Sequence, residues 1–466
     1  MLKTDLDLSD EAQAMSNEFG LHLVSGVAGS GKSLLVLYRA RLLRQFFPQK
    51  RILVLTHNRP LIHDLEARYQ RLAGSDAMVE WRTFLSWCMA HWASGEPKLH
   101  PIGERSRSQL LSQTWHQHLA DTVISERMLQ EEIDWLKDRL LNTRQAYLAA
   151  DRTGRGFGLN ETMRGRMYDA ILTYHRLLKE QKLADWGDVP RRMWLALQEG
   201  RANPVPYDFI LVDEAQFFAP IWFEIIKLIL KPNGHLFMVA DPTQGFLKRG
   251  QSWLASGLNV RGRSSRLEKC YRTTREILDF ASQMYQLRLP GDDEALVAPH
   301  VQHMPGGIPP QIIGLDSEQD EIAQVINEIR ALHQHGTPLE HILIVHAEWQ
   351  GADRMLGRLQ KEFGMAAVAN PKGVAPGKHI RVCTMNAATG LESPIVFVMG
   401  LHRMWEAEQS VRISEEERAE LVRDNTRKFY MAFTRAGQRL AITYVGNLPV
   451  VFQGLASPSA PSAQSV

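Results

Sequence analysis

The octapeptide Gly26-Val-Ala-Gly-Ser-Gly31-Lys32-Ser33 is the most informative stretch of this chain. It matches the pattern GxxxxGK[ST] in full, follows the apolar run Leu21–Ser25 and precedes a helical pattern. A strand, a glycine-rich loop and a helix in this order bind phosphate, because backbone N–H groups and the helix N-terminus attract an anion. The pattern therefore predicts a nucleotide site. Its predicted contacts are Gly26, Val27, Ala28, Gly29, Ser30, Gly31, Lys32 and Ser33.

Such a loop needs acidic partners, and Asp213 and Glu214 are the candidates. They follow the apolar run Phe209–Val212, and ligands of parallel sheets bind at the carboxyl ends of the strands. We expect Lys32 to reach the β- and γ-phosphates, and Ser33 and Asp213 to hold Mg²⁺. Glu214 would polarise the attacking water. The alternative is an exposed acidic pair in a loop. ATP and Mg²⁺ are the expected cofactors.

A third apolar run, His235–Ala240, ends in the polar sequence Asp241-Pro-Thr-Gln244. The amide of Gln244 would hydrogen-bond the γ-phosphate or the attacking water and so sense hydrolysis. Taken alone, an ordinary turn residue explains Gln244 equally well.

Short apolar runs alternate with amphipathic stretches along the chain, which predicts an α/β fold with parallel sheets. Several runs are apolar throughout, as expected of strands covered on both faces. Between 91 and 184 only helical patterns occur, which indicates an α-helical insertion in the first α/β domain. The predicted strands are Leu21–Ser25, Arg51–Thr56, Phe209–Val212, His235–Ala240, His341–Val345, Met365–Val368, Ile380–Met385, Ile395–Met399 and Leu440–Val445.

Composition narrows the class of protein further. The 466 residues are 44% hydrophobic and 23% charged, which suits two or three folded domains and excludes wholesale disorder. A net charge of +2 excludes a strongly basic coat protein. The three cysteines are far apart, which argues against zinc and disulfides. The acidic N-terminus is unlike a signal peptide, and no apolar run nears a membrane span, so we expect a cytoplasmic protein.

Eight further segments complete a pattern. In order along the chain these are Ile52-Leu-Val-Leu-Thr56-His-Asn58, Arg82-Thr83-Phe84-Leu-Ser86-Trp87, Leu183-Ala-Asp185-Trp186-Gly-Asp188, the VDEAQ and VADPTQ runs, Leu267-Glu-Lys-Cys-Tyr271-Arg272, Thr384-Met-Asn386-Ala-Ala-Thr389-Gly390-Leu391-Glu392 and Phe429-Tyr430-Met-Ala432-Phe-Thr434-Arg435. With the phosphate loop, they resemble the UvrD/Rep-like branch of superfamily 1 helicases over about residues 8 to 446.

The resemblance implies two RecA-like domains that clamp one ATP between them. Residues 1–90 and 185–272 would form the first domain, 91–184 the helical insertion, 273–450 the second domain and 451–466 a disordered tail. Gln13 and Tyr271 would contact adenine, Arg39 would lie beside the nucleotide, and Glu392 would contact the ribose. Arg272 and Arg435 would be arginine fingers, with surface ion pairs as the alternative.

The resemblance also implies that single-stranded DNA crosses both domains and moves 3′ to 5′ as ATP is hydrolysed. Thr56, Asn58 and Thr83 would contact its backbone from the first domain, and Thr384 and Asn386 from the second. Two aromatic residues, Phe84 and Trp253, are candidates for stacking on bases. Packing in the protein core is an equal alternative for both.

The chain departs from the family pattern between motifs IV and V, which begin at 267 and 384. The large second insertion that family members carry there is absent, so autonomous duplex unwinding stays open. Asn386 and Thr389 replace the usual histidine and lysine, and His346 stands where an arginine is usual. The basic loop Arg152–Gly158 is interpreted as solvated, with nucleic-acid contact as the alternative.

Two other functions remain open from the sequence. The chain could be an ATP-sensing subunit that gates a partner nuclease or toxin, for example in an anti-phage assembly, and the missing insertion motivates this hypothesis. It could also act on RNA, because backbone contacts do not reveal recognition of the 2′-hydroxyl.

Overall fold

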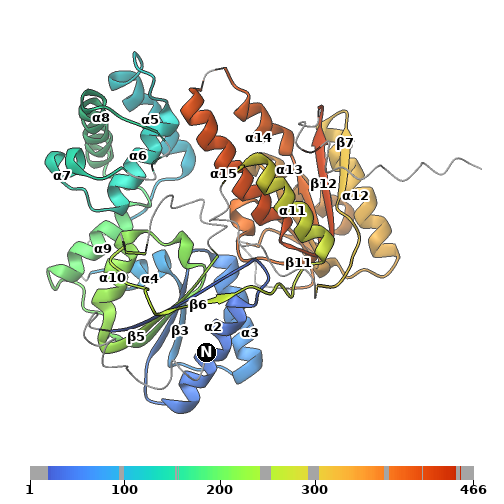
Figure 1. Cartoon of the computed structure of the whole chain (residues 1–466), viewed down its shortest axis with the longest axis horizontal. Helices are drawn as coiled ribbons and strands as arrows, with labels where there is room; N and C mark the ends of the chain where they lie inside the picture. The colour runs from blue at the N-terminus through green and yellow to red at the C-terminus, as the bar shows by residue number, and fades with distance from the viewer. Residues whose placement is uncertain are drawn as a thin grey trace, which may run out of the picture.

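The computed structural model describes residues 19–93, 99–152, 155, 157–241, 253–254, 256–291, 304–371, 377–411, 413–447 and 452. Two six-stranded parallel sheets lie side by side, and a helical unit lies above the first sheet and beside the second (Figure 1). The α/β class with two RecA-like domains, expected from the sequence, is confirmed. No helix of the described residues is long and apolar enough to cross a membrane.

The first sheet has the strand order β3-β2-β4-β5-β1-β6. Its strands are β1 (Gly20–Gly26), β2 (Ile52–Thr56), β3 (Val79–Thr83), β4 (Tyr207–Val212), β5 (Leu230–Ala240) and β6 (Ser264–Leu267). Its helices are α2 (Lys32–Phe46), α3 (Arg59–Ala73), α4 (Phe84–Ala90), α9 (Asp188–Gln198) and α10 (Pro220–Ile229), with the short 3₁₀ helix Ala215–Phe217. Helices α2 and α3 cover one face, and α4, α9 and α10 cover the other. β2 and β4 are therefore buried along their whole length, which explains their continuous apolar sequences.

The second sheet has the order β7-β12-β11-β8-β10-β9. Its strands are β7 (Gln311–Leu315), β8 (Ile342–His346), β9 (Val368–Ala369), β10 (Ile380–Thr384), β11 (Ser393–Met399) and β12 (Ala436–Val445). Its helices are α11 (Arg275–Arg288), α12 (Glu318–Gln334), α13 (Trp349–Phe363), α14 (Leu401–Glu408) and α15 (Glu415–Phe433), with short 3₁₀ helices at Leu339–His341, Met365–Ala367 and Asn386–Ala388. Helices α11, α14 and α15 pack on one face, and α12 and α13 on the other.

The strands that the sequence did not reveal are edge or near-edge pieces. β3 and β6 are the two edges of the first sheet, and β7 is an edge of the second. An edge strand is covered less completely, so its sequence lacks a continuous apolar run. At the other edge, Met365–Ala367 is a 3₁₀ helix and the strand begins only at Val368, which corrects the predicted strand 365–368.

The helical insertion leaves the first domain after α4, which follows the carboxyl end of β3. It comprises α5 (Glu104–His118), α6 (Glu126–Asp138), α7 (Arg144–Ala149) and α8 (Glu161–Glu180), which share their own apolar core. A buried ion cluster fixes its base: Lys137 Nζ lies 2.7 Å from Asp185 and 2.8 Å from Asp188. The Lys137 ammonium lowers the pKa of Asp185 although burial opposes this.

Arg152 and Arg155, the two arginines of the basic loop after α7, are largely buried and already paired. Arg152 and Arg155 both pair with Glu132, which is fully buried, and the Arg155 contact measures 2.8 Å. Both guanidiniums also lie over the rings of Trp135 and Phe157. These arginines therefore hold the insertion together, because a buried carboxylate needs compensating charge.

The described residues between β6 and β10 all belong to the second sheet, to the helices that cover it or to their connections. The two undescribed stretches there, 292–303 and 372–376, are too short to form another domain. At the far end, Phe452 is fully buried against Trp405, with ring centroids 5.2 Å apart, although the sequence placed it in the tail. The rest of that predicted tail lies outside the described residues.

Candidate nucleotide site between the two sheets

The phosphate loop joins β1 to α2 and owes its shape to two glycines. Gly29 and Gly31 have φ values of 73° and 89°, a backbone region that L side chains rarely adopt. Gly31 is also the residue before the first turn of α2. The Nζ of Lys32 donates to the carbonyl oxygens of Gly26 and Val27, both at 2.8 Å, and lies 3.3 Å from Asp241. This ammonium is therefore held over the loop, where phosphate oxygens would compete for it.

Two carboxylates follow β4, as expected for a parallel sheet. Asp213 is buried, and burial together with the charge of Glu214 raises its pKa to about 7. Glu214 has a left-handed backbone (φ 56°, ψ 46°), which is uncommon for a residue with a side chain and is typical of functional sites. The Gln216 amide donates to Glu214 over 2.5 Å and accepts from the N–H of Asp241. Gln216 thus fixes Glu214 to the end of β5.

The residues expected to hold Mg²⁺ fit such an ion. Asp213 Oδ2 is buried and accepts no hydrogen bond from the described residues. The hydroxyl of Ser33 hydrogen-bonds to Asp213, and this contact opposes the rise in the pKa of that carboxyl group. Oxygen ligands of this kind suit Mg²⁺, which binds one or two protein oxygens together with substrate phosphates.

Residues from the second half of the chain complete the site. The N–H of Tyr271 donates to the carbonyl of Gly29 over 2.9 Å. Glu392 lies between two arginines: Arg272 at 2.6 Å and Arg68 of α3 at 3.0 Å. Burial alone would raise the pKa of Glu392, but these arginines hold it below its ordinary value. One carboxylate therefore joins the two domains.

Arg435 follows α15 and is almost completely buried. Its guanidinium donates to the carbonyls of Met431, at 3.1 Å, and Leu391, at 3.3 Å. Burial and the nearby charge of Arg272 lower the pKa of Arg435 to about 10, so the group stays charged at neutral pH. The carboxylate of Glu214 acts in the opposite direction, which places Arg435 within electrostatic range of that residue.

These side chains line one pocket of about 800 Å³ between the two domains. Its lining residues are Ala28, Gly29, Ser30, Gly31, Lys32, Ser33, Leu34, Arg68, Glu214, Tyr271, Arg272, Glu392 and Arg435. The side chain of Tyr271 is 75% exposed and is therefore available for stacking.

Three predicted nucleotide residues are placed differently or not at all. Gln13 and Gln244 lie outside the described residues. Arg39 is on the inner side of α2, with its guanidinium 4.3 Å from the centroid of the Phe237 ring, and does not line the pocket.

The predicted strand-binding residues of the first domain are largely enclosed. Thr56 is fully buried, and its hydroxyl lacks a partner among the described residues. Thr83 caps the N-terminus of α4, because its Oγ1 accepts from the N–H of Ser86. Asn58 caps the N-terminus of α3 in the same way, and its side-chain amide donates to the carbonyl of Thr389 over 2.8 Å. Asn58 therefore joins the carboxyl edge of the first sheet to the second domain.

The two predicted stacking aromatics pack within the first domain. Phe84 is fully buried and stacks on Trp222, with ring centroids 4.4 Å apart and an interplanar angle of 10°. Trp253 is half-buried and packs edge-on against Phe223 at 6.0 Å. For Phe84 the packing alternative from the sequence describes the structure, because no base can reach this ring while the core is intact.

The corresponding edge of the second sheet is more open. Thr384, at the end of β10, is half-buried, and Asn386 is exposed. Thr384 pairs with His346 at the end of β8, so the turn after β8 lies at the same edge. Trp349 follows that turn as the first residue of α13 and is 65% exposed. The sequence interpretation overlooked Trp349 because no motif includes it.

Other residues of the site were also overlooked. Arg68 meets Glu392 only because the two domains come together, whereas Gln216 contacts Glu214 and Asp241 within the first domain. Asp241 was noted only as the end of a strand. The available signal was position in the sequence. Gln216 comes shortly after Asp213 and Glu214, and Asp241 directly follows β5.

Comparisons with known proteins agree with this geometry. The family described as "UvrD/REP helicase N-terminal domain" matches residues 8–246, just over half of the chain. A "Probable DNA helicase II homolog" of Mycoplasma capricolum is 23% identical over 310 residues, which cover 59% of this chain. The match covers 41% of that relative, so the chain spans less than half of the relative's length. The phosphate loop, the carboxylates after β4 and the family match lead to one assignment: the chain belongs to the UvrD/REP helicase family.

Proposed function

We propose that this chain is an ATP-driven motor that moves along single-stranded DNA in the 3′ to 5′ direction. The observation that carries the proposal is the shared pocket. Lys32 and Glu214 of the first domain share it with Arg435 of the second domain and with Arg272, which lies between β6 and α11 where the two domains join. Family membership supports DNA as the polymer and ATP with Mg²⁺ as the energy source.

The pocket residues have separable roles in this proposal. Lys32 holds the phosphates, with Ser33 and Asp213 as the oxygen ligands of the metal. Bound ATP with Mg²⁺ supplies the phosphoryl group that is transferred to water. Glu214 orients that water, and the Gln216 amide keeps Glu214 in place. Arg435 stabilises the charge that develops on the phosphate oxygens, an effect worth roughly 10³–10⁵ in rate when an arginine reaches the transition state.

Hydrolysis and movement are coupled because the domains share residues. Arg68 of the first domain and Arg272 each pair with one oxygen of Glu392, and Asn58 contacts the carbonyl of Thr389. A nucleotide that draws Arg272 toward its phosphates changes these contacts. The relative position of Asn58 and Asn386, at the two sheet edges, would then change with each cycle.

The strand would follow the carboxyl edges of both sheets. Asn386 and Thr384 offer polar contacts to the backbone, and we assign Trp349 as the aromatic surface on which a base stacks. Base–aromatic stacking is tolerant of sequence and is worth roughly 1–3 kcal/mol per base. We therefore expect little sequence preference.

The proposal is tested by the rate of ATP hydrolysis with and without single-stranded DNA. We expect strong stimulation by DNA in the native protein and none in Glu214→Gln, which should retain ATP and DNA binding. Matched RNA and DNA oligonucleotides decide which polymer stimulates. Normal ATP binding with an unstimulated rate in the native protein would contradict the motor proposal.

Duplex unwinding is a separate question, because the described residues between β6 and β10 all belong to the second sheet, to its helices or to their connections. We propose that the isolated chain unwinds only short tailed duplexes. Strand displacement on tails of either polarity measures this directly. Displacement from 5′ tails alone would contradict the proposed direction.

A further inference from the structure

The helical insertion touches the second domain through the first turns of α15. Ser125, just before α6, donates to Glu417 over 2.8 Å. Nearby, Arg127 lies 3.6 Å from Asp424, and the N–H of Gly158 lies 3.5 Å from Glu416. Figure 1 shows α15 on the side of the second domain that lies beside the helical unit. We call this contact the bridge.

The bridge completes a closed circuit of protein. The first domain continues into the insertion after α4, the insertion contacts α15 at the bridge, and α15 runs into β12 of the second sheet. The second domain returns to the first through Arg68–Glu392 and through Asn58 with the carbonyl of Thr389. Asn58 belongs to the contact on the side of the pocket, and Asn386 precedes Thr389 by three residues, so the carboxyl edges of both sheets lie beside this closure of the circuit.

The charge of the bridge argues that it closes the circuit and does not itself hold DNA. Its α15 side carries Glu415, Glu416 and Glu417 in the first turn. Three adjacent carboxylates repel phosphates. Glu417 accepts from the hydroxyl of Ser125 and Glu416 from the N–H of Gly158, while Asp424 pairs with the guanidinium of Arg127.

The bridge is also built so that it can open. Its contacts are two hydrogen bonds and one ion pair at 3.6 Å, and polar contacts of this kind are individually weak and are screened by salt. On the side of the pocket the chain itself also joins the two domains, between β6 and α11, whereas the bridge is made of non-covalent contacts. The bridge is therefore the weaker of the two closures.

We propose that the bridge encloses the translocating strand in a ring of protein. This inference rests on the proposed function. It specifies the substrate: a strand with a free end threads through the closed ring, whereas a closed circle enters only when the bridge opens. Enclosure would keep the motor on its strand even while its phosphate contacts are broken.

The test is a covalent link across the bridge in the full chain. Gly158→Cys and Glu416→Cys place two thiols at exposed positions, and a side chain at Gly158 would meet no atom within 4 Å. The native residues Cys88, Cys270 and Cys383 are buried and therefore protected. A short thiol-to-thiol crosslinker is added either before or after binding to circular single-stranded DNA. Salt weakens phosphate contacts by roughly a thousand-fold or more between 50 and 200 mM, so high salt removes protein that is held by charge alone.

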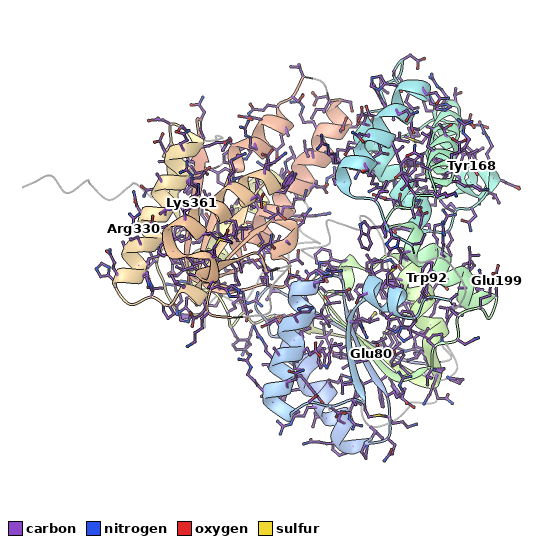
Figure 2. All side chains as sticks on the ribbon, turned by 180° about the vertical axis from the view of Figure 1, so that it is seen from behind. Glu80, Trp92, Tyr168, Glu199, Arg330 and Lys361 are labelled. Atoms are coloured by element: carbon purple, nitrogen blue, oxygen red, sulfur yellow. The ribbon has the colours of Figure 1, made fainter. Side chains whose placement is uncertain are left out.

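Linking after binding should give complexes on circles that survive high salt, while linear strands of the same length are released. Linking before binding should prevent loading on circles but not on linear strands. The matched control is Arg330→Cys with Glu362→Cys, an ion pair at 2.5 Å within the second domain. Figure 2 shows Arg330 on the side of the molecule opposite the insertion, which is marked by Tyr168. A link there closes no ring and should leave salt sensitivity unchanged.

Three results would overturn the inference in distinguishable ways. If no crosslink forms, the bridge itself is absent. If the linked protein is released from circles by salt as readily as the control, the strand lies outside the ring and the motor proposal stands. If unlinked protein binds no single strand at all, the proposed function fails and the ring fails with it.

Discussion

The two parallel-sheet domains have the same layered build but carry different parts of the site. The first supplies the phosphate loop and the carboxylates Asp213 and Glu214, which bind and position. The second supplies Arg435, which is buried and charged, and the carboxylate of Glu392. Neither domain alone contributes all of the described residues that line the pocket. Under the proposed function, this difference assigns affinity for ATP mainly to the first domain and makes the rate depend on the approach of the second.

The carboxyl edges of the two sheets differ as well. In the first domain the polar residues at this edge begin helices, and Phe84 is part of the core. In the second domain Asn386 and Trp349 are exposed. The edge of the first sheet is therefore packed into its own core, whereas the edge of the second sheet is open to a ligand. Under the proposed function, the bases of the strand would meet mainly the second domain.

The largest expected effect separates rate from affinity. Arg435→Ala should lower kcat for ATP hydrolysis by roughly 10³-fold or more while ATP affinity changes little, because the arginine acts on the transition state. Steady-state hydrolysis and equilibrium binding of a fluorescent ATP analogue measure the two quantities. Arg330→Ala, an arginine of the same domain on its outer side, is the control, and thermal unfolding reports any loss of structure. Unchanged turnover would remove Arg435 from the catalytic site.

The next effect concerns the edge of the first domain. Phe84→Ala should cost about 3–5 kcal/mol of stability, because it removes a fully buried ring that stacks on Trp222. Urea unfolding measures this cost, and Phe84→Leu should cost less because it leaves a smaller cavity. A variant of native stability whose DNA affinity is lowered would instead restore the stacking role predicted from the sequence.

The opposite behaviour is expected at the edge of the second domain. Trp349→Ala should leave stability within about 0.5 kcal/mol, as is usual for exposed positions. It should weaken binding of single strands by about 1–3 kcal/mol if the ring stacks on a base. Fluorescence anisotropy with normal and abasic oligonucleotides measures this. The native protein and the variant should bind the abasic strand equally, and an equal loss on both strands would argue against stacking.

The smallest effect is a pH dependence. Burial, aided by the charge of Arg354, lowers the pKa of His346 to about 4. The unfolded chain therefore binds more protons than the folded chain between about pH 4 and 6.5, so stability is present above this window and is lost as the pH falls through it. At pH 5.5 the loss of stability due to His346 should be about 1.4 kcal/mol. His346→Gln should remove this part of the pH dependence of the free energy of unfolding, and an unchanged dependence would show that folding does not lower the pKa of His346.

Much of the fold could be predicted because central strands in a two-faced parallel sheet must be apolar throughout. Ile52–Thr56 and Tyr207–Val212 are examples. Edge strands have no such requirement, and the sequence Ser264–Leu267 gives no apolar signal at all. The prediction that the loop after α7 is solvated was wrong for a related reason. Their sequence resembles a solvated loop, and only the fold shows that Glu132 is buried beneath them.

The sequence by itself determined the chemistry of the phosphate loop, because its glycines and Lys32 lie within eight consecutive residues and fold locally. It also determined that two sheets of parallel strands would form. The tertiary structure alone decided that Arg68 and Arg272 share Glu392, that Phe84 belongs to the core and that α15 reaches Ser125 of the insertion. Those contacts join residues that lie more than a hundred positions apart, and the local sequence does not indicate which distant surfaces will meet.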